Sequence, residues 1–105
     1  MTNYKLPFAN GNYPRTAEEK EYIIEQASKA YEKYMDALGF DWRTDPNSAE
    51  TPHRVAKAFV NDLAEGCYNN PPKITAFDNI DGYDGVVFQG NIKVTSMCSH
   101  HHLPF

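Results

Sequence analysis

The sequence predicts an α+β fold in which a pair of helices is followed by a strand. Two segments carry apolar residues at intervals of three and four, which is the period of an amphipathic helix. A third segment, 86–95, alternates apolar and polar residues, which is the period of a half-buried strand. At 105 residues the chain has the length of one small domain. We therefore expect one domain or a part of one.

Residues 1–14 are expected to form an irregular arm. This stretch mixes proline, glycine and asparagine, which favour turns, and its apolar residues follow no sustained period. The arm is predicted to lead directly into the first helix.

The first helix is predicted over 16–38. Thr16 offers a hydroxyl at the N-cap and Glu19 a carboxylate three residues later, a pairing that satisfies two backbone amides at a helix start. Gly39 suits the left-handed position that follows a last helical turn. The apolar face consists of Ile23, Ala27, Ala30, Tyr31, Tyr34 and Leu38.

The second helix is predicted to begin with Thr51 as N-cap and Pro52 in the first helical position, where a missing amide proton costs nothing. The turn-forming residues within 40–50 separate it from the first helix, and Gly66 ends it. Because a short loop joins the two helices, the helical pair over 16–66 is expected to pack antiparallel. Its apolar face is made by Val55, Phe59 and Leu63.

Residues 67–85 are rich in Asn, Pro and Gly and are predicted to be a loop, with a short extended piece at 73–77. The strand and a histidine cluster occupy 86–105. Gly90, in the middle of the alternating pattern, indicates a bulge or a close backbone approach. The strand is expected to deliver Cys98 into the cluster.

Cys98 and His101 stand in a C-x-x-H arrangement at the end of this strand. A chain that turns there can bring a thiolate and an imidazole to one ion, and this pair of donors favours zinc. Two ligands fill half of a tetrahedral site, so a structural zinc needs two more protein ligands, and a catalytic zinc needs one more and a water. The other candidates are Cys67, His53 and the carboxylates.

By spacing alone two interpretations of this cluster stay open. The first is the metal site, in which His100 lies beside a ligand and acts as a general acid or base, because an imidazole titrates near neutral pH. The second is a polar surface tract that resembles a purification tag. The amphipathic stripes of the two helices are interpreted as core.

Composition excludes several classes of function. A net charge of −4, with scattered basic residues, disfavours binding to nucleic acid, which needs a Lys and Arg patch. No apolar run reaches the length of a signal-peptide core or a membrane span, so a cytoplasmic location without membrane association is expected. Cys67 and Cys98 are too few for a disulfide framework and are expected to be reduced.

Two motifs, TPHRVAK at 51–57 and CSHHHLPF at 98–105, together resemble the amino-terminal half of the GTP cyclohydrolase I family. In that family a helix opening with T-P-x-R-V-A is followed, after a loop and a strand, by S-M-C-E-H-H-x-x-P-F. The resemblance covers most of 15–105, which is thereby interpreted as the amino-terminal part of such a domain. It implies that the strand belongs to an antiparallel sheet with helices on one face, the tunnelling fold or T-fold.

The resemblance also implies an activity and a site. Cys98 and His101 match two zinc ligands, and His100 matches the histidine that handles protons. The family's reaction is a zinc-dependent hydrolytic opening of the imidazole ring of GTP with loss of formate, giving 7,8-dihydroneopterin triphosphate for tetrahydrofolate and pterin biosynthesis. Family members are homodecamers with sites shared between subunits, so a homo-oligomer is implied.

Two positions depart from the family pattern. Ser99 stands in place of the usual Glu, and His102 in place of an apolar residue. The family's third zinc ligand, its guanine-reading carboxylate and its triphosphate-binding basic residues lie downstream of the matched part. The resemblance therefore implies that these residues alone are inactive and need a complementing carboxyl-terminal chain. The alternative is a non-catalytic metal-binding or subunit-interaction module derived from that family.

Overall fold

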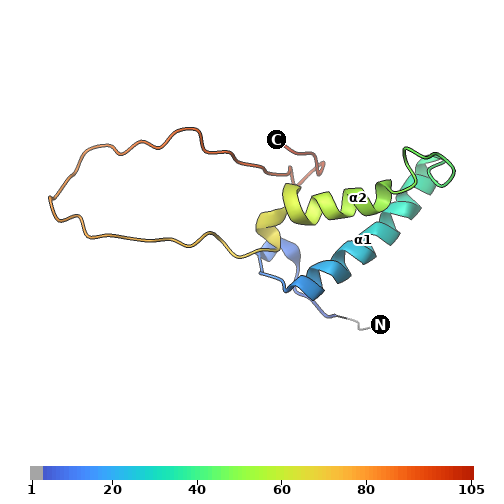
Figure 1. Ribbon diagram of the computed structural model, residues 1–105, viewed down its shortest axis with the longest axis horizontal. Coiled ribbons are helices and arrows are strands. Elements are labelled where there is room, and N and C mark those ends of the chain that lie inside the picture. Colours follow the sequence, from blue (N-terminus) through green and yellow to red (C-terminus); the bar gives the residue numbers. More distant parts are fainter. Residues whose placement is uncertain (1–3) are drawn as a thin grey trace.

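The computed structural model describes residues 4–105, and its regular elements are helical. Met1, Thr2 and Asn3, which belong to the predicted irregular arm, lie outside the described residues. Figure 1 shows α1 and α2 running in opposite directions from a common loop, as the sequence predicts. The elements are the 3-10 turn η1 (Ala9–Gly11), α1 (Ala17–Leu38), α2 (Thr51–Ala58), the π-turn η2 (Phe59–Leu63) and the 3-10 turn η3 (Glu65–Cys67).

Both ends of α1 follow from local signals in the sequence. The Thr16 amide donates to Glu19 Oε1 at 2.8 Å, and the Glu19 amide donates to Thr16 Oγ1 at 3.1 Å, which confirms the predicted capping box. At the other end Gly39 adopts the left-handed region with φ 86°, and its amide donates to carbonyls of the last turn. Here a residue with a Cβ would be strained.

The second helix differs from its prediction at both ends. Glu50 rather than Thr51 is the N-cap, so Thr51 already lies inside the helix, and Pro52 still occupies the first turn. After Ala58 the chain changes to π geometry, in which the Ala64 amide donates to the Phe59 carbonyl at 2.8 Å. The extra residue per turn rotates the helical face just before the chain leaves the helical pair.

A small apolar core lies where α2 and η2 cross α1. In the second helical segment Val60 is 1% exposed and Ala56 is 4% exposed, and Met35, near the end of α1, is also buried. Trp42, in the connecting loop, is also buried. Because burial of apolar area is the main stabilising contribution to folding, this core fixes the helical pair.

An exposed polar cluster attaches the connecting loop to α1. The Asp36 carboxylate accepts two hydrogen bonds from the Arg43 guanidinium, at 2.7 and 3.0 Å, and one from Trp42 Nε1 at 2.9 Å. The guanidinium also lies 4.3 Å from the centroid of the Trp42 ring. Hydrogen bonds from Arg43 and then Trp42 lower the pKa of Asp36 from its ordinary value of 3.8.

The strand predicted for 86–95 is absent, and residues 70–95 form an open loop without regular structure (Figure 1). This loop raises the radius of gyration to 19.1 Å, whereas a compact chain of this length has about 13 Å. The alternating pattern is present in the sequence, but a strand also needs a neighbour for its backbone N–H and C=O groups. Within residues 4–105 the segment finds none, so the predicted sheet does not form.

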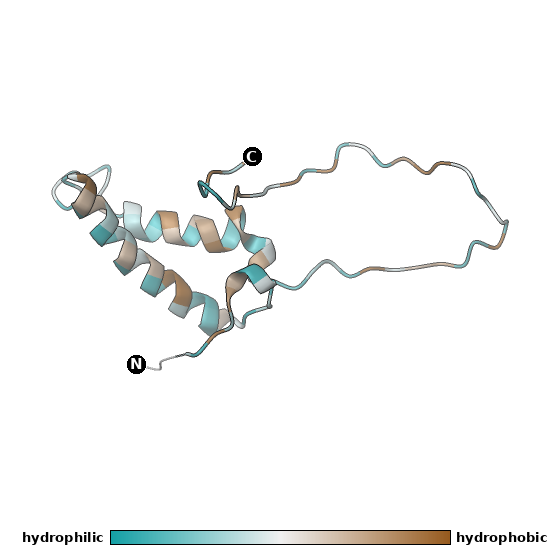
Figure 2. Ribbon diagram, turned by 180° about the vertical axis from the view of Figure 1, so that it is seen from behind, coloured by the Kyte–Doolittle hydropathy of each residue, from teal (hydrophilic) through white to brown (hydrophobic). Residues whose placement is uncertain are grey.

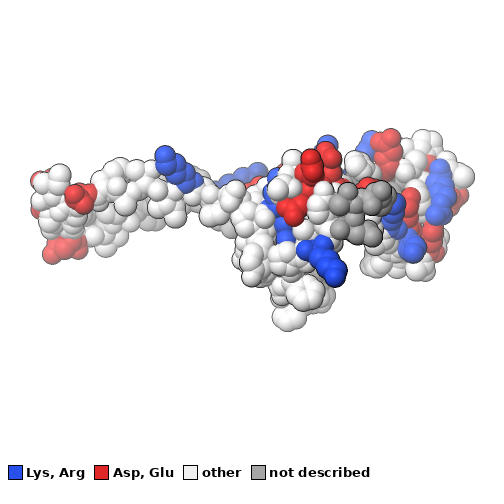
Figure 3. All heavy atoms as spheres, turned by 90° about the horizontal axis from the view of Figure 1, so that it is seen from below, with Lys and Arg blue, Asp and Glu red and all other residues white. Residues whose placement is uncertain are grey.

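The open loop exposes apolar side chains that a sheet would cover on one face. Phe77, Val86 and Phe88 are 89%, 88% and 87% exposed. Figure 2 shows apolar residues along both limbs of the loop. In the view of Figure 3 most of the loop's surface is uncharged, while Lys, Arg, Asp and Glu are interspersed over the helical pair. Residues 4–105 include no helix with the length and apolar character needed to cross a membrane.

Candidate metal and catalytic turn

The candidate site lies in a hairpin at 96–105, which we call the terminal turn. Its two limbs meet through an antiparallel bridge between Met97 and Pro104 and through reciprocal backbone hydrogen bonds between Ser96 and Phe105, at 2.9 and 3.3 Å. Closer to the tip, the Cys98 amide donates to the Leu103 carbonyl at 2.9 Å. These bonds close the turn locally, and Figure 1 places it beside the end of α2.

The terminal turn brings together the two residues of the C-x-x-H motif. Cys98 Sγ lies 3.9 Å from His101 Nδ1. Two ligands of one tetrahedral zinc, with Zn–S and Zn–N bonds of their usual lengths, are separated by about 3.5 Å. The half-buried thiol and the exposed imidazole therefore fit one zinc ion after a small side-chain adjustment.

The other two histidines of the cluster occupy different surroundings. The exposed ring of His100 has its centroid 6.5 Å from that of His101, in an edge-to-face arrangement. The ring of His102 packs against Phe59, with 5.8 Å between centroids and 39° between ring planes. His100 thus lies beside the candidate ligand pair, while His102 contacts the helical pair.

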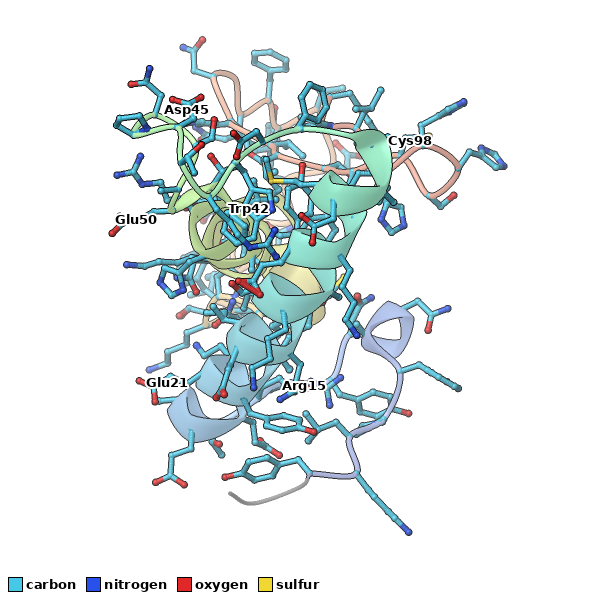
Figure 4. The ribbon with its side chains drawn as sticks, turned by 90° about the vertical axis from the view of Figure 1, so that its right-hand side faces the viewer. Arg15, Glu21, Trp42, Asp45, Glu50 and Cys98 are labelled. Atoms are coloured by element: carbon cyan, nitrogen blue, oxygen red, sulfur yellow. The ribbon has the colours of Figure 1, made fainter. Side chains whose placement is uncertain are left out.

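The remaining candidate ligands do not join this pair. Among residues 4–105, no three His, Cys, Asp or Glu side chains are grouped so that they can hold a metal ion. Cys67 is half-buried in η3, and His53 is exposed on α2, where it lines an open cleft between α1 and α2. Figure 4 shows Cys98 on the terminal turn, apart from the connecting loop that carries Asp45 and Glu50.

A second cavity, of about 690 Å³, separates η3 from the first limb of the terminal turn. Cys67 and Met97 line it from opposite sides, together with Asn12 of the arm. Next to Cys67, burial raises the pKa of the Tyr68 hydroxyl, and the nearby thiol contributes to the same shift. This cavity was not foreseen, because it depends on where the loop returns to the helical pair.

Sequence patterns also missed the part played by Phe59. Its spacing in the second helix predicts a core position, and the side chain is half-buried. The structure places its ring against His102, a residue 43 positions later. An aromatic residue in the middle of an apolar stripe gives no signal of such a contact.

Comparison with known proteins identifies the family. The family model described as GTP cyclohydrolase I matches residues 27–105. GTP cyclohydrolase 1 of Flavobacterium johnsoniae is 40% identical over 106 aligned positions, which cover 98% of this chain and 45% of that protein. The enzyme of the same name from Tolumonas auensis is 40% identical, with coverage of 82% and 38%. That from Aeromonas salmonicida is 43% identical, with coverage of 64% and 31%.

The chain spans less than half the length of these relatives, and no solved structure matches it. The matched region includes α2, the open loop and the terminal turn, so it contains both motifs that carry the resemblance. The family match also covers the carboxyl-terminal half of α1. The chain belongs to the GTP cyclohydrolase I family.

Proposed function

We propose that this chain supplies the amino-terminal part of a zinc-dependent GTP cyclohydrolase I. The reaction is hydrolytic opening of the guanine imidazole ring of GTP, with loss of formate and formation of 7,8-dihydroneopterin triphosphate. The observation that carries the proposal is the 3.9 Å approach of Cys98 Sγ to His101 Nδ1 in a chain of this family. A thiol and an imidazole at this separation suit two ligands of one zinc ion.

Each residue of the terminal turn has a distinct role in this proposal. Cys98 and His101 hold the zinc, which when bound supplies Lewis acidity and lowers the pKa of a coordinated water. His100, exposed beside His101, gives and accepts protons as the ring opens, which is the general acid and base role that histidine most often takes in enzymes. Ser99 leaves this surface without the carboxylate that the family usually has there.

The rest of the site is proposed to come from the part of the family that this chain does not span. Two ligands hold zinc poorly, and a triphosphate needs basic side chains that the terminal turn does not carry. We propose that a carboxyl-terminal portion pairs with 86–95, so that this segment becomes the first strand of the antiparallel sheet. Assembly of several subunits would then cover the apolar side chains that the open loop exposes.

The test combines zinc content with turnover. The chain is mixed, or joined in one polypeptide, with the carboxyl-terminal part of the Flavobacterium johnsoniae relative, and pterin fluorescence from GTP is followed. Cys98→Ala and His101→Ala are expected to lose both zinc and turnover. His100→Ala is expected to keep zinc and lose turnover. Cys67→Ala and His53→Ala, as matched controls, are expected to retain both, and zinc retained in both ligand variants would overturn the proposal.

One observation favours a second candidate function, a non-catalytic module that docks onto intact subunits. Val86 and Phe88 are exposed in a segment whose backbone has no strand partner within residues 4–105, and such a segment tends to associate with another chain. Native mass of the chain alone and with an intact relative separates the candidates. Binding without any gain of zinc or turnover in the mixture above favours the module.

A further inference from the structure

We propose that Phe59 is a positioning residue for the zinc ligands and that it acts through His102. The inference rests on the proposed function, and it adds a residue from the helical pair to the site. The carrying observation is the contact between the Phe59 and His102 rings, at 5.8 Å between centroids. It joins the end of α2 to the residue directly after His101.

The backbone at His102 adopts an uncommon conformation. His102 has φ 55°, in the left-handed region that residues other than glycine seldom occupy. Its amide donates to the Cys98 carbonyl at 2.8 Å, and this bond closes the tip that contains His101. The conformation of His102 therefore determines how closely Cys98 and His101 approach each other.

Phe59 is a firm anchor because its neighbours are fixed. It begins the π-turn η2, and its carbonyl accepts the Ala64 amide. The next residue, Val60, is 1% exposed in the core. A ring held by a core element restricts the orientation of the partner ring.

The long loop cannot supply this restraint. Residues 70–95 are without regular structure, and Val94, near their end, is 74% exposed. The terminal turn thus depends for its placement on contacts with the helical pair, and the Phe59–His102 ring pair provides such a contact at the tip.

The test measures Zn²⁺ affinity, by competition with a chelator, of the chain joined to the carboxyl-terminal part of the Flavobacterium johnsoniae relative. Phe59→Ala is expected to weaken binding about tenfold, the size of effect that residues supporting metal ligands typically have. Phe59→Tyr, which keeps an aromatic ring at this position, is expected to retain wild-type Zn²⁺ affinity. His102→Ala should match Phe59→Ala, His102→Phe should retain wild-type affinity, and the double alanine variant should be no weaker than either single variant.

A second measurement does not depend on metal. In the zinc-free chain, Phe59→Ala is expected to speed amide hydrogen exchange at Cys98 and His102, while Phe77→Ala, which removes an exposed ring from the loop, leaves it unchanged. Far-ultraviolet circular dichroism confirms that the helices persist in each variant. If the chain joined to the relative's carboxyl-terminal part binds no zinc, the proposed function fails, and exchange in the zinc-free chain alone decides the inference.

Two results would overturn the positioning role. One is unchanged Cys98 and His102 exchange in Phe59→Ala, which would show that the ring contact does not hold the turn. The other is loss of zinc affinity in His102→Phe equal to that in His102→Ala. That result would make the His102 imidazole a ligand in its own right.

Discussion

The helical pair over 17–67 and the carboxyl-terminal segment over 70–105 have similarly clear sequence patterns and very different structures. In the helical pair, the capping box and Gly39 satisfy backbone groups locally, and Met35 of α1 and Ala56 of α2 are buried. The prediction that the apolar stripe of α1 is core was wrong for most of its members, because Ala27, Ala30, Tyr34 and Leu38 are exposed and Ile23 and Tyr31 are half-buried. In the carboxyl-terminal segment, the alternating pattern of 86–95 remains exposed. The difference teaches that a helix completes its hydrogen bonds within one segment, whereas a strand needs a second one.

The largest expected difference in stability between the two regions comes from replacing one valine with alanine in each. Val60→Ala is expected to lower the free energy of unfolding by about 2 kcal/mol, because two buried methyl groups are lost and a cavity remains. Val87→Ala, at a position 83% exposed, is expected to leave it unchanged. Urea unfolding followed by far-ultraviolet circular dichroism measures both, and equal effects would remove the contrast.

A smaller effect is expected from two glycines with left-handed backbones. Gly39, at φ 86°, ends α1, and Gly82, at φ 63°, lies in the open loop, with open space around each position. Gly39→Ala is expected to cost about 1 kcal/mol, because a Cβ is unfavourable in this conformation. Gly82→Ala is expected not to alter the same urea transition. A matching loss in Gly82→Ala would mean that the loop unfolds together with the helices.

A loss of stability comparable to that of Gly39→Ala, or slightly smaller, is expected from a change at the start of α1. Thr16→Ala removes the hydroxyl that accepts the Glu19 amide and is expected to cost up to about 1 kcal/mol. Thr75→Ala, in the exposed loop, is the matched control and is expected to be neutral. Thermal unfolding midpoints of the two variants give the comparison, and an unchanged midpoint in Thr16→Ala would contradict the role of the cap.

The smallest effect concerns pH. The pKa of Asp36 is lowered from 3.8 by Arg43 and Trp42, so its contribution to stability is present above that value and is lost as the pH falls below it. Asp36→Asn removes the contribution at every pH. The gap between the wild-type and Asp36→Asn melting temperatures is therefore expected to be constant near neutral pH and to shrink below pH 3.8. A gap that widens in acid would contradict the assignment.

The parts of the fold that sequence predicted correctly are those governed by neighbours in the chain. Thr16, Glu19 and Gly39 placed α1 within one residue, since capping depends on residues three or four apart. The π geometry at 59–63 has no such local signal in the sequence. The strand predicted at 86–95 does not form because it has no neighbouring strand within residues 4–105, although its alternating pattern is present in the sequence.

In the candidate site, too, the contacts between residues close in the sequence were predicted and the contact between distant residues was not. The C-x-x-H spacing predicted that Cys98 and His101 would approach each other, and they do, at 3.9 Å. The contact of His102 with Phe59 joins residues far apart in the sequence, and no sequence motif predicts it. Spacing therefore identifies the donors, and only the structure shows what holds them in place.

Cobalt binding tests most directly the claim that the terminal turn provides ligands to a metal. Co²⁺ bound by a thiolate gives a sulfur-to-cobalt charge-transfer band, which reports on thiolate ligation without any enzyme activity, and its change in a Cys98 variant reports on Cys98. The measurement uses the chain joined to the relative's carboxyl-terminal part. The band is expected in the wild-type joined chain and in the Cys67→Ser variant of that joined chain. It is expected to vanish in Cys98→Ser. A band that survives in Cys98→Ser and vanishes in Cys67→Ser would contradict the account and place the metal at η3.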